Sequence, residues 1–78
     1  MLSLKPCIKL YLHDICRDLD ICWEDYLTQL DYEFPMIKYI EDYKEVTLYV
    51  EVLLYFVELG LKEYRTILKD LTWIIKNE

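Results

Sequence analysis

The chain has 78 residues, so we expect a single domain over residues 1–78 whose core uses most of the apolar side chains. Apolar residues make up 55% of the chain, and 9 basic against 15 acidic residues give a formal net charge of −6. Because an acidic chain repels phosphate backbones, direct nucleic-acid binding is not expected. No apolar run approaches the roughly 18 uncharged residues of a membrane span, so we predict no membrane segment and no membrane partner.

Apolar residues between positions 8 and 30 recur at spacings of three and four, which predicts an amphipathic helix. The apolar stripe keeps its phase throughout, and this favours one continuous helix. The alternative is a break near Asp20, with two acidic residues in the first turn of a new helix. Pro35 is predicted to push Phe34 out of the α region and so to end the segment.

A second helix is predicted from position 35 to position 59, followed by a third over positions 61–75. Gly60, the only glycine, stands where a left-handed residue would end the second helix. The residues at 46–57 also favour a strand, but no partner strand or hairpin turn accompanies them. We therefore predict an all-α fold, a small antiparallel bundle of three, possibly four, helices.

Candidates for catalysis and metal binding are few. On a helix Cys7, Cys16 and Cys22 lie too far apart for a disulfide, and we expect reduced, buried thiols in a cytoplasmic protein. His13, the only histidine, lacks the paired cysteines that a structural zinc site uses. One serine and one glycine cannot supply a nucleophile with its base or a phosphate-binding loop. We predict no enzymatic activity, no metal and no cofactor.

Acidic residues gather in the first predicted helix. Like charges four residues apart repel one another by roughly a few tenths of a kcal/mol. One interpretation is a solvated face that keeps an apolar chain in solution. The other is a docking surface for a protein partner with a basic surface, including the nucleic-acid-binding surface of another protein. We name this set the acidic strip: Asp14, Asp18, Asp20, Glu24, Asp25 and Asp31.

The last turns of the second predicted helix are apolar on all sides. At 100° per residue, one row of side chains from Leu48 to Leu59 lies opposite Val50, with the spacing of a coiled-coil seam. This seam is either core or a partner interface. Trp73 lies off the apolar stripe of the third helix, so its ring is predicted either to be partly exposed or to fold back over the end of the bundle. The candidate apolar interface comprises Leu48, Val52, Tyr55, Phe56, Leu59 and Trp73.

These features favour a small acidic protein-binding module. The chain contains no alanine and only two arginines, and this composition indicates an AT-rich genome, such as that of a phage, a virus or a mobile element. The leading hypothesis is an inhibitor or modulator of a host protein in the host cytoplasm, for example an anti-defence protein that blocks a basic nucleic-acid-binding surface. The alternative is a structural homodimer, or a small subunit of a larger complex, assembled through the Leu48–Leu59 seam.

Overall fold

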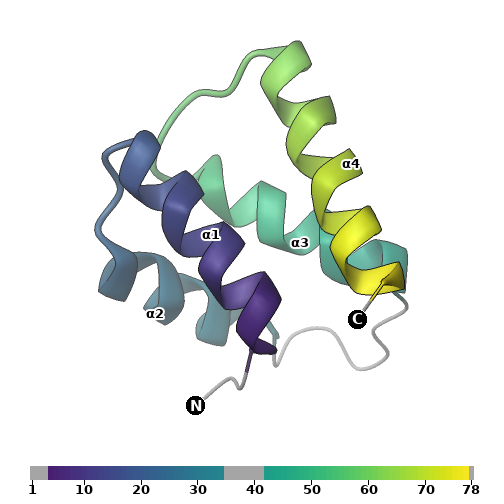
Figure 1. Cartoon of the computed structure of the whole chain (residues 1–78). Helices are drawn as coiled ribbons and strands as arrows, with labels where there is room; N and C mark the ends of the chain where they lie inside the picture. Colours follow the sequence, from purple (N-terminus) through teal and green to yellow (C-terminus); the bar gives the residue numbers. More distant parts are fainter. Residues whose placement is uncertain (1–3, 35–41, 78) are drawn as a thin grey trace.

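The computed structural model describes residues 4–34 and 42–77, without the side chains of 42–44, and this part of the chain forms four helices and no strand. The predicted all-α fold is confirmed, and the strand alternative for positions 46–57 is wrong. In Figure 1, α1 rises from the N-terminus, α4 descends to the C-terminus, and α3 lies behind the space between them. The helices are α1 (Pro6–Asp18), α2 (Trp23–Glu33), α3 (Asp42–Leu53) and α4 (Leu61–Lys76).

The prediction of one continuous first helix is wrong, because the chain turns between α1 and α2. The N–H of Ile21 donates to the carbonyl of Cys16 at 2.8 Å, and the N–H of Asp20 donates to the carbonyl of Arg17 at 3.2 Å. This pair of bonds is a Schellman motif, which satisfies the last carbonyls of a helix. Asp20 takes the left-handed conformation, with φ of 60°, which aspartate tolerates better than most residues.

The apolar phase does not reveal this break because Leu19, Cys22 and Trp23 continue the stripe across the turn. Ile21 is buried although it lies between the two helices. α2 then begins with Glu24 and Asp25 in its first turn, where carboxylates interact favourably with the helix dipole. α2 ends at Glu33, but Phe34 keeps helical dihedral angles, so the predicted effect of Pro35 on that residue is wrong.

α3 ends earlier than predicted. After Leu53 the chain continues through the turn residues 54–56, and residues 58–60 have no regular secondary structure. Gly60 has φ of −70° and ψ of 158°, so it is the N-cap of α4 and not the left-handed end of α3. Its N–H donates to Glu63 Oε2 at 2.7 Å, which satisfies one donor at the start of the helix. Positions 35–41 of the predicted second helix lie outside the described residues.

The core is centred on α3, which packs against α2 and α4, while α1 packs against the same two helices from the other side. A helix that is apolar on most sides is stable only when its neighbours cover it. The hydroxyl of Tyr26 donates to the carbonyl of Tyr49 at 2.9 Å, so this buried polar group has a partner. The buried side chains of α3 are Val46, Leu48, Tyr49, Val50, Val52 and Leu53.

Candidate functional site

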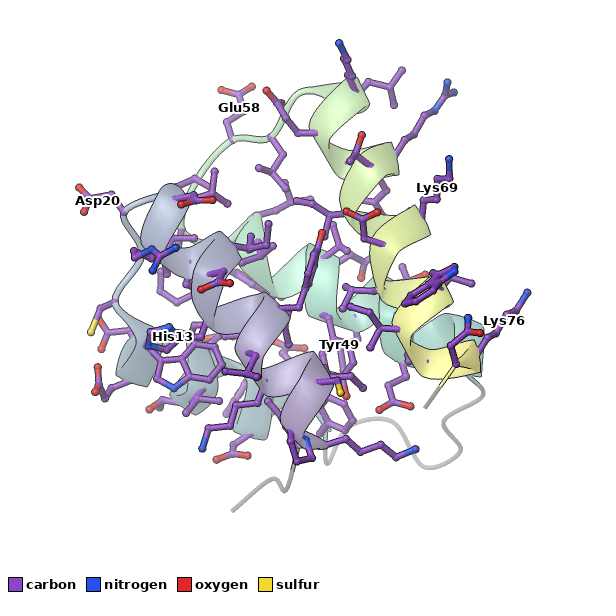
Figure 2. The ribbon with its side chains drawn as sticks, in the orientation of Figure 1. His13, Asp20, Tyr49, Glu58, Lys69 and Lys76 are labelled. Atoms are coloured by element: carbon purple, nitrogen blue, oxygen red, sulfur yellow. The ribbon has the colours of Figure 1, made fainter. Side chains whose placement is uncertain are left out.

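The acidic strip follows the bend from α1 through the turn into α2, and does not lie on one helix. Asp14 and Asp18 are in the last turns of α1, and Asp20 is in the turn. All members are exposed except Asp31, which is half-buried. Figure 2 shows Asp20 at one edge of the molecule, on the side opposite Lys69 and Lys76 of α4. The break in the first helix therefore brings carboxylates from two helices around one corner.

Arg17 offsets part of the charge of the strip. Its Nη2 lies 3.5 Å from Asp14 Oδ1, and its Nε lies 3.9 Å from Asp18 Oδ1. Because all three side chains are more than 60% exposed, each pair contributes at most about 1 kcal/mol. An ion pair this weak leaves the two carboxylates available to a stronger cationic partner.

The start of α2 holds a carboxylate in its ionised form. The pKa of Glu24 is lowered by its own backbone N–H, then by the thiol of Cys22, whose Sγ lies 3.3 Å from Glu24 Oε2, and also by His13. The ring of His13 meets that of Trp23 edge-on at 5.2 Å, and Trp23 stacks on Tyr26 at 5.7 Å. These contacts tie α1 to α2 beneath the strip.

The thiols are less uniform than predicted. Cys16 is buried, as expected, but Cys7 and Cys22 are exposed, so the prediction of burial is wrong for those two. Cys7 lies in the first turn of α1 and Cys22 in the turn before α2, where no helix covers them. Burial raises the pKa of the Cys16 thiol to about 12. Within residues 4–34 and 42–77, no three side chains of His, Cys, Asp or Glu are placed to hold a metal ion.

The candidate apolar interface is divided between the core and the surface. Leu48 and Val52 are buried within the chain. Tyr55 and Phe56 are exposed and lie in the turn after α3, while Leu59 is half-buried in the loop before α4. Because α3 ends at Leu53, these residues do not form one helical seam, and the expected row from 48 to 59 is wrong as a helix face.

Tyr55 belongs to a small cluster of exposed tyrosines and carboxylates. Its hydroxyl donates to Glu33 Oε1 at 3.1 Å. The pKa of Tyr55 is raised by this bond and then by the charge of Glu33, with smaller contributions that include Glu51 and Tyr32. Sequence reasoning did not single out Tyr32, which is exposed at the end of α2. Its large exposed ring is a second aromatic side chain near Tyr55.

Between α1 and α4 lies a surface groove of about 460 Å³, which we call the α1–α4 groove. In Figure 1 the two helices diverge toward the loop that precedes α4, and the groove occupies this divergence. The hydroxyl of Tyr11 donates to Asp70 Oδ2 at 3.0 Å and joins the helices across it. Burial, and then the bond to Asp70, raises the pKa of Tyr11, so the hydroxyl keeps its proton to a higher pH than an exposed tyrosine does.

The groove has apolar walls and a charged rim. The walls are Tyr11, Ile15, Leu19, Leu59 and Ile67. The rim is Asp18, Lys62, Glu63, Thr66 and Asp70. Tyr11, Ile15 and Leu19 belong to the predicted apolar stripe, but no local pattern in the sequence pairs them with residues of α4. The groove was therefore not predicted.

α4 differs in charge from α2 and from the chain as a whole. The four basic and two acidic residues of Leu61–Lys76 give the helix a net charge of +2, and Arg65, Lys69 and Lys76 lie outside the groove. Trp73 is 66% exposed on the outer face of this helix, as the first of the two alternatives for its ring predicts. Lys69 and Lys76 flank it at helical spacing and point away from the body of the molecule in Figure 2. This face is remote from Asp20 in the same view.

Comparison with known protein families, with characterised proteins and with solved structures finds no match to this chain. In the part of the chain that the structure describes, no helix is both long and apolar enough to span a membrane.

Proposed function

We propose that the chain is a protein-binding module whose acidic strip docks on a basic surface of another protein. The observation that carries this proposal is the corner formed by α1, the turn and α2, where Asp14, Asp20 and Asp25 are all exposed. Bringing a cationic surface to this corner relieves repulsion among the carboxylates. Proteins that bind phosphate backbones present basic surfaces, and an acidic ligand can occupy such a surface in place of the nucleic acid. The specific form that we propose is therefore an inhibitor of a nucleic-acid-binding protein.

The division of the apolar interface supports this proposal over a structural homodimer. Leu48 and Val52 already fill the core of one chain, so the seam cannot present them to a second copy. Tyr55, Phe56 and Trp73 remain exposed, and aromatic residues are frequent anchors in protein interfaces. No observation on the described residues favours the homodimer, and we do not propose it.

A charge-reversal pair tests the proposed function. Asp14→Lys with Asp25→Lys changes the strip, and Glu51→Lys with Glu58→Lys changes exposed carboxylates elsewhere. Each pair takes the net charge from −6 to −2, because each reversal adds two charges, so the variants match in net charge. The chain and both variants are immobilised, and proteins captured from a lysate are identified by mass spectrometry.

We expect the chain and the Glu51/Glu58 variant to capture the same basic protein and the Asp14/Asp25 variant to lose it. The captured protein, once purified, is then titrated with its own nucleic acid in the presence of the chain. The chain should weaken that binding at least tenfold, equivalent to about 1.4 kcal/mol. Equal capture by all three proteins, or nucleic-acid binding that the chain leaves unchanged, would contradict the proposal.

A further inference from the structure

The α1–α4 groove shares only Asp18 with the acidic strip. Its volume of about 460 Å³ is within the range of sites that bind ligands. Its lining residues on α4 run from Lys62 to Asp70, which are eight residues apart, or about 12 Å at 1.5 Å per residue. A lining that follows a helix over this length can accommodate the side chains of a chain segment.

The spacing of the groove matches one face of a short helix. Apolar anchors at positions i, i+4 and i+7 of a helix span about 10 Å, which is close to the length of this lining. Ile15 and Leu19 on α1 are themselves four residues apart, so the walls repeat at the same interval. Three aliphatic anchors can therefore pack between α1 and α4 in succession.

The rim determines the charge of the occupant. Asp18, Glu63 and Asp70 stand against Lys62, so the charged residues of the rim sum to −2. The carboxylate of Asp70 uses one oxygen to accept the Tyr11 hydroxyl, and that of Glu63 uses one oxygen to accept the Gly60 N–H. Each keeps further acceptor capacity for an arginine or lysine side chain. Among the described helices of a second copy, only α4 has a net positive charge, so a second copy would have to present α4 to this rim, and sedimentation distinguishes that arrangement.

We propose that the α1–α4 groove binds an amphipathic helix of the partner protein, with aliphatic anchors in its walls and arginine or lysine side chains on its rim carboxylates. This inference rests on the proposed function, because it names the element by which a basic partner is held next to the acidic strip. The strip then supplies charge attraction, while the groove supplies the apolar contact that fixes register.

A matched pair of threonine substitutions tests the groove. Thr66 is exposed on the rim, and its hydroxyl donates to the Lys62 carbonyl four residues earlier. Thr28 is exposed on α2 outside the groove, and its hydroxyl donates to the Glu24 carbonyl in the same way. Thr66→Trp places a large ring across the groove, whereas Thr28→Trp makes the same chemical change elsewhere. Circular dichroism and thermal unfolding establish that both variants remain folded.

The probes are three short synthetic helices. The first carries leucine at i, i+4 and i+7 with flanking arginines, the second replaces the arginines by glutamates, and the third replaces the leucines by serines. Binding is measured by calorimetry and mapped by chemical-shift changes in the isotope-labelled chain. We expect the first helix to bind at least tenfold more tightly than the other two, with the largest shifts at Ile15, Leu19 and Ile67. Thr66→Trp should weaken it at least tenfold, and Thr28→Trp should leave it unchanged.

Three results would overturn the inference. Equal affinity for Thr66→Trp and the unaltered chain would place the helix elsewhere, as would shifts confined to Asp14, Asp20 and Asp25. A chain that sediments alone at twice its mass, and as a monomer after Thr66→Trp, would assign the groove to a second copy. Failure of the groove is distinct from failure of the strip, because Asp14→Lys with Asp25→Lys leaves every groove residue in place.

Discussion

Two connections contribute residues to the α1–α4 groove: the turn between α1 and α2, and the loop before α4. In the first a residue other than glycine is left-handed, whereas in the second the glycine is not. In the turn between α1 and α2, Asp20 adopts the left-handed conformation that usually requires glycine. In the loop before α4, Gly60 adopts an extended conformation that any residue can take. The first turn is closed by two backbone hydrogen bonds and a buried Ile21. In the second connection the backbone N–H groups of residues 54–57 still donate to carbonyls of α3, and the Gly60 N–H donates to Glu63. Residue type alone is therefore a poor guide to the backbone conformation of a turn.

The largest effect should come from removing the apolar contact of the first turn. Ile21→Ala deletes a buried side chain and should lower the free energy of unfolding by about 2–3 kcal/mol. Leu59→Ala, at the half-buried position of the second connection, should cost about 1 kcal/mol. Urea denaturation measures both. Equal losses would show that the two connections bury their aliphatic residues to the same extent.

Alkaline pH should destabilise the folded chain through the buried thiol of Cys16, which lies in the last turn of α1. Burial raises the pKa of this thiol from its ordinary value near 9 to about 12, so the unfolded chain loses the proton before the folded chain does. The contribution is therefore complete below about pH 9 and is lost as pH rises toward 12. The free energy of unfolding should fall by up to about 1.4 kcal/mol per pH unit in this range.

The control for the alkaline effect is Cys16→Ala. This variant should be less stable at neutral pH but should show a flatter pH dependence between pH 9 and 10, below the ionisation of the tyrosines. The pKa values of Tyr11 and Tyr26 are also raised, mainly by burial, so they add a further loss only above about pH 10. The same slope in the variant and the unaltered chain would exclude Cys16 as the source.

Relieving the left-handed conformation of Asp20 should stabilise the chain moderately. Asp20→Gly should raise the free energy of unfolding by about 1 kcal/mol, and Asp20→Val should lower it by a similar amount or more. Asp20→Asn removes the charge while keeping a residue that tolerates this conformation, and so separates charge from geometry. Thermal unfolding of the three variants measures these changes, and a destabilised Asp20→Gly would contradict the prediction that the left-handed conformation of Asp20 costs stability.

The smallest effect is expected at Gly60. Gly60→Ala should change the free energy of unfolding by no more than about 0.5 kcal/mol, because its φ of −70° suits any residue. An added Cβ would lie 2.5 Å from Glu63 Oε2, the flexible end of a side chain, which has to shift while it keeps its bond to the Gly60 N–H. A loss greater than about 1 kcal/mol in denaturant unfolding would show that the conformational freedom of glycine is needed there.

Periodicity predicted the helical class and the region of α4, because those features depend on which side chains are apolar at helical spacing. It left open whether the second apolar row of α3 is core or interface. It did not predict the break at Asp20, since Leu19, Cys22 and Trp23 continue the apolar stripe in phase across a turn that contains no glycine. It extended α3 to position 59 because the residues beyond Leu53 are as apolar as the helix itself.

For the candidate surfaces too, local sequence patterns predicted which residues take part but not how they are arranged in space. The members of the acidic strip could be listed from the sequence, but their arrangement around a corner depends on the turn. The α1–α4 groove joins Tyr11 to Asp70 across 59 positions, and no local pattern carries that pairing. Exposure of Trp73 could be predicted as one of two alternatives, because exposure on a helix depends first on the stripe of that helix.

The separation of charge between the two sides gives the molecule a permanent dipole moment. Positions 19–34 carry five acidic residues and no basic residue, or −5, whereas α4 carries +2. The longest dimension is 28 Å, while charges in physiological salt are screened beyond about 8 Å. At that salt concentration an approaching surface responds to the nearest side alone. In dilute buffer, where screening extends to about 30 Å, the same surface responds to the whole molecule and turns it before contact.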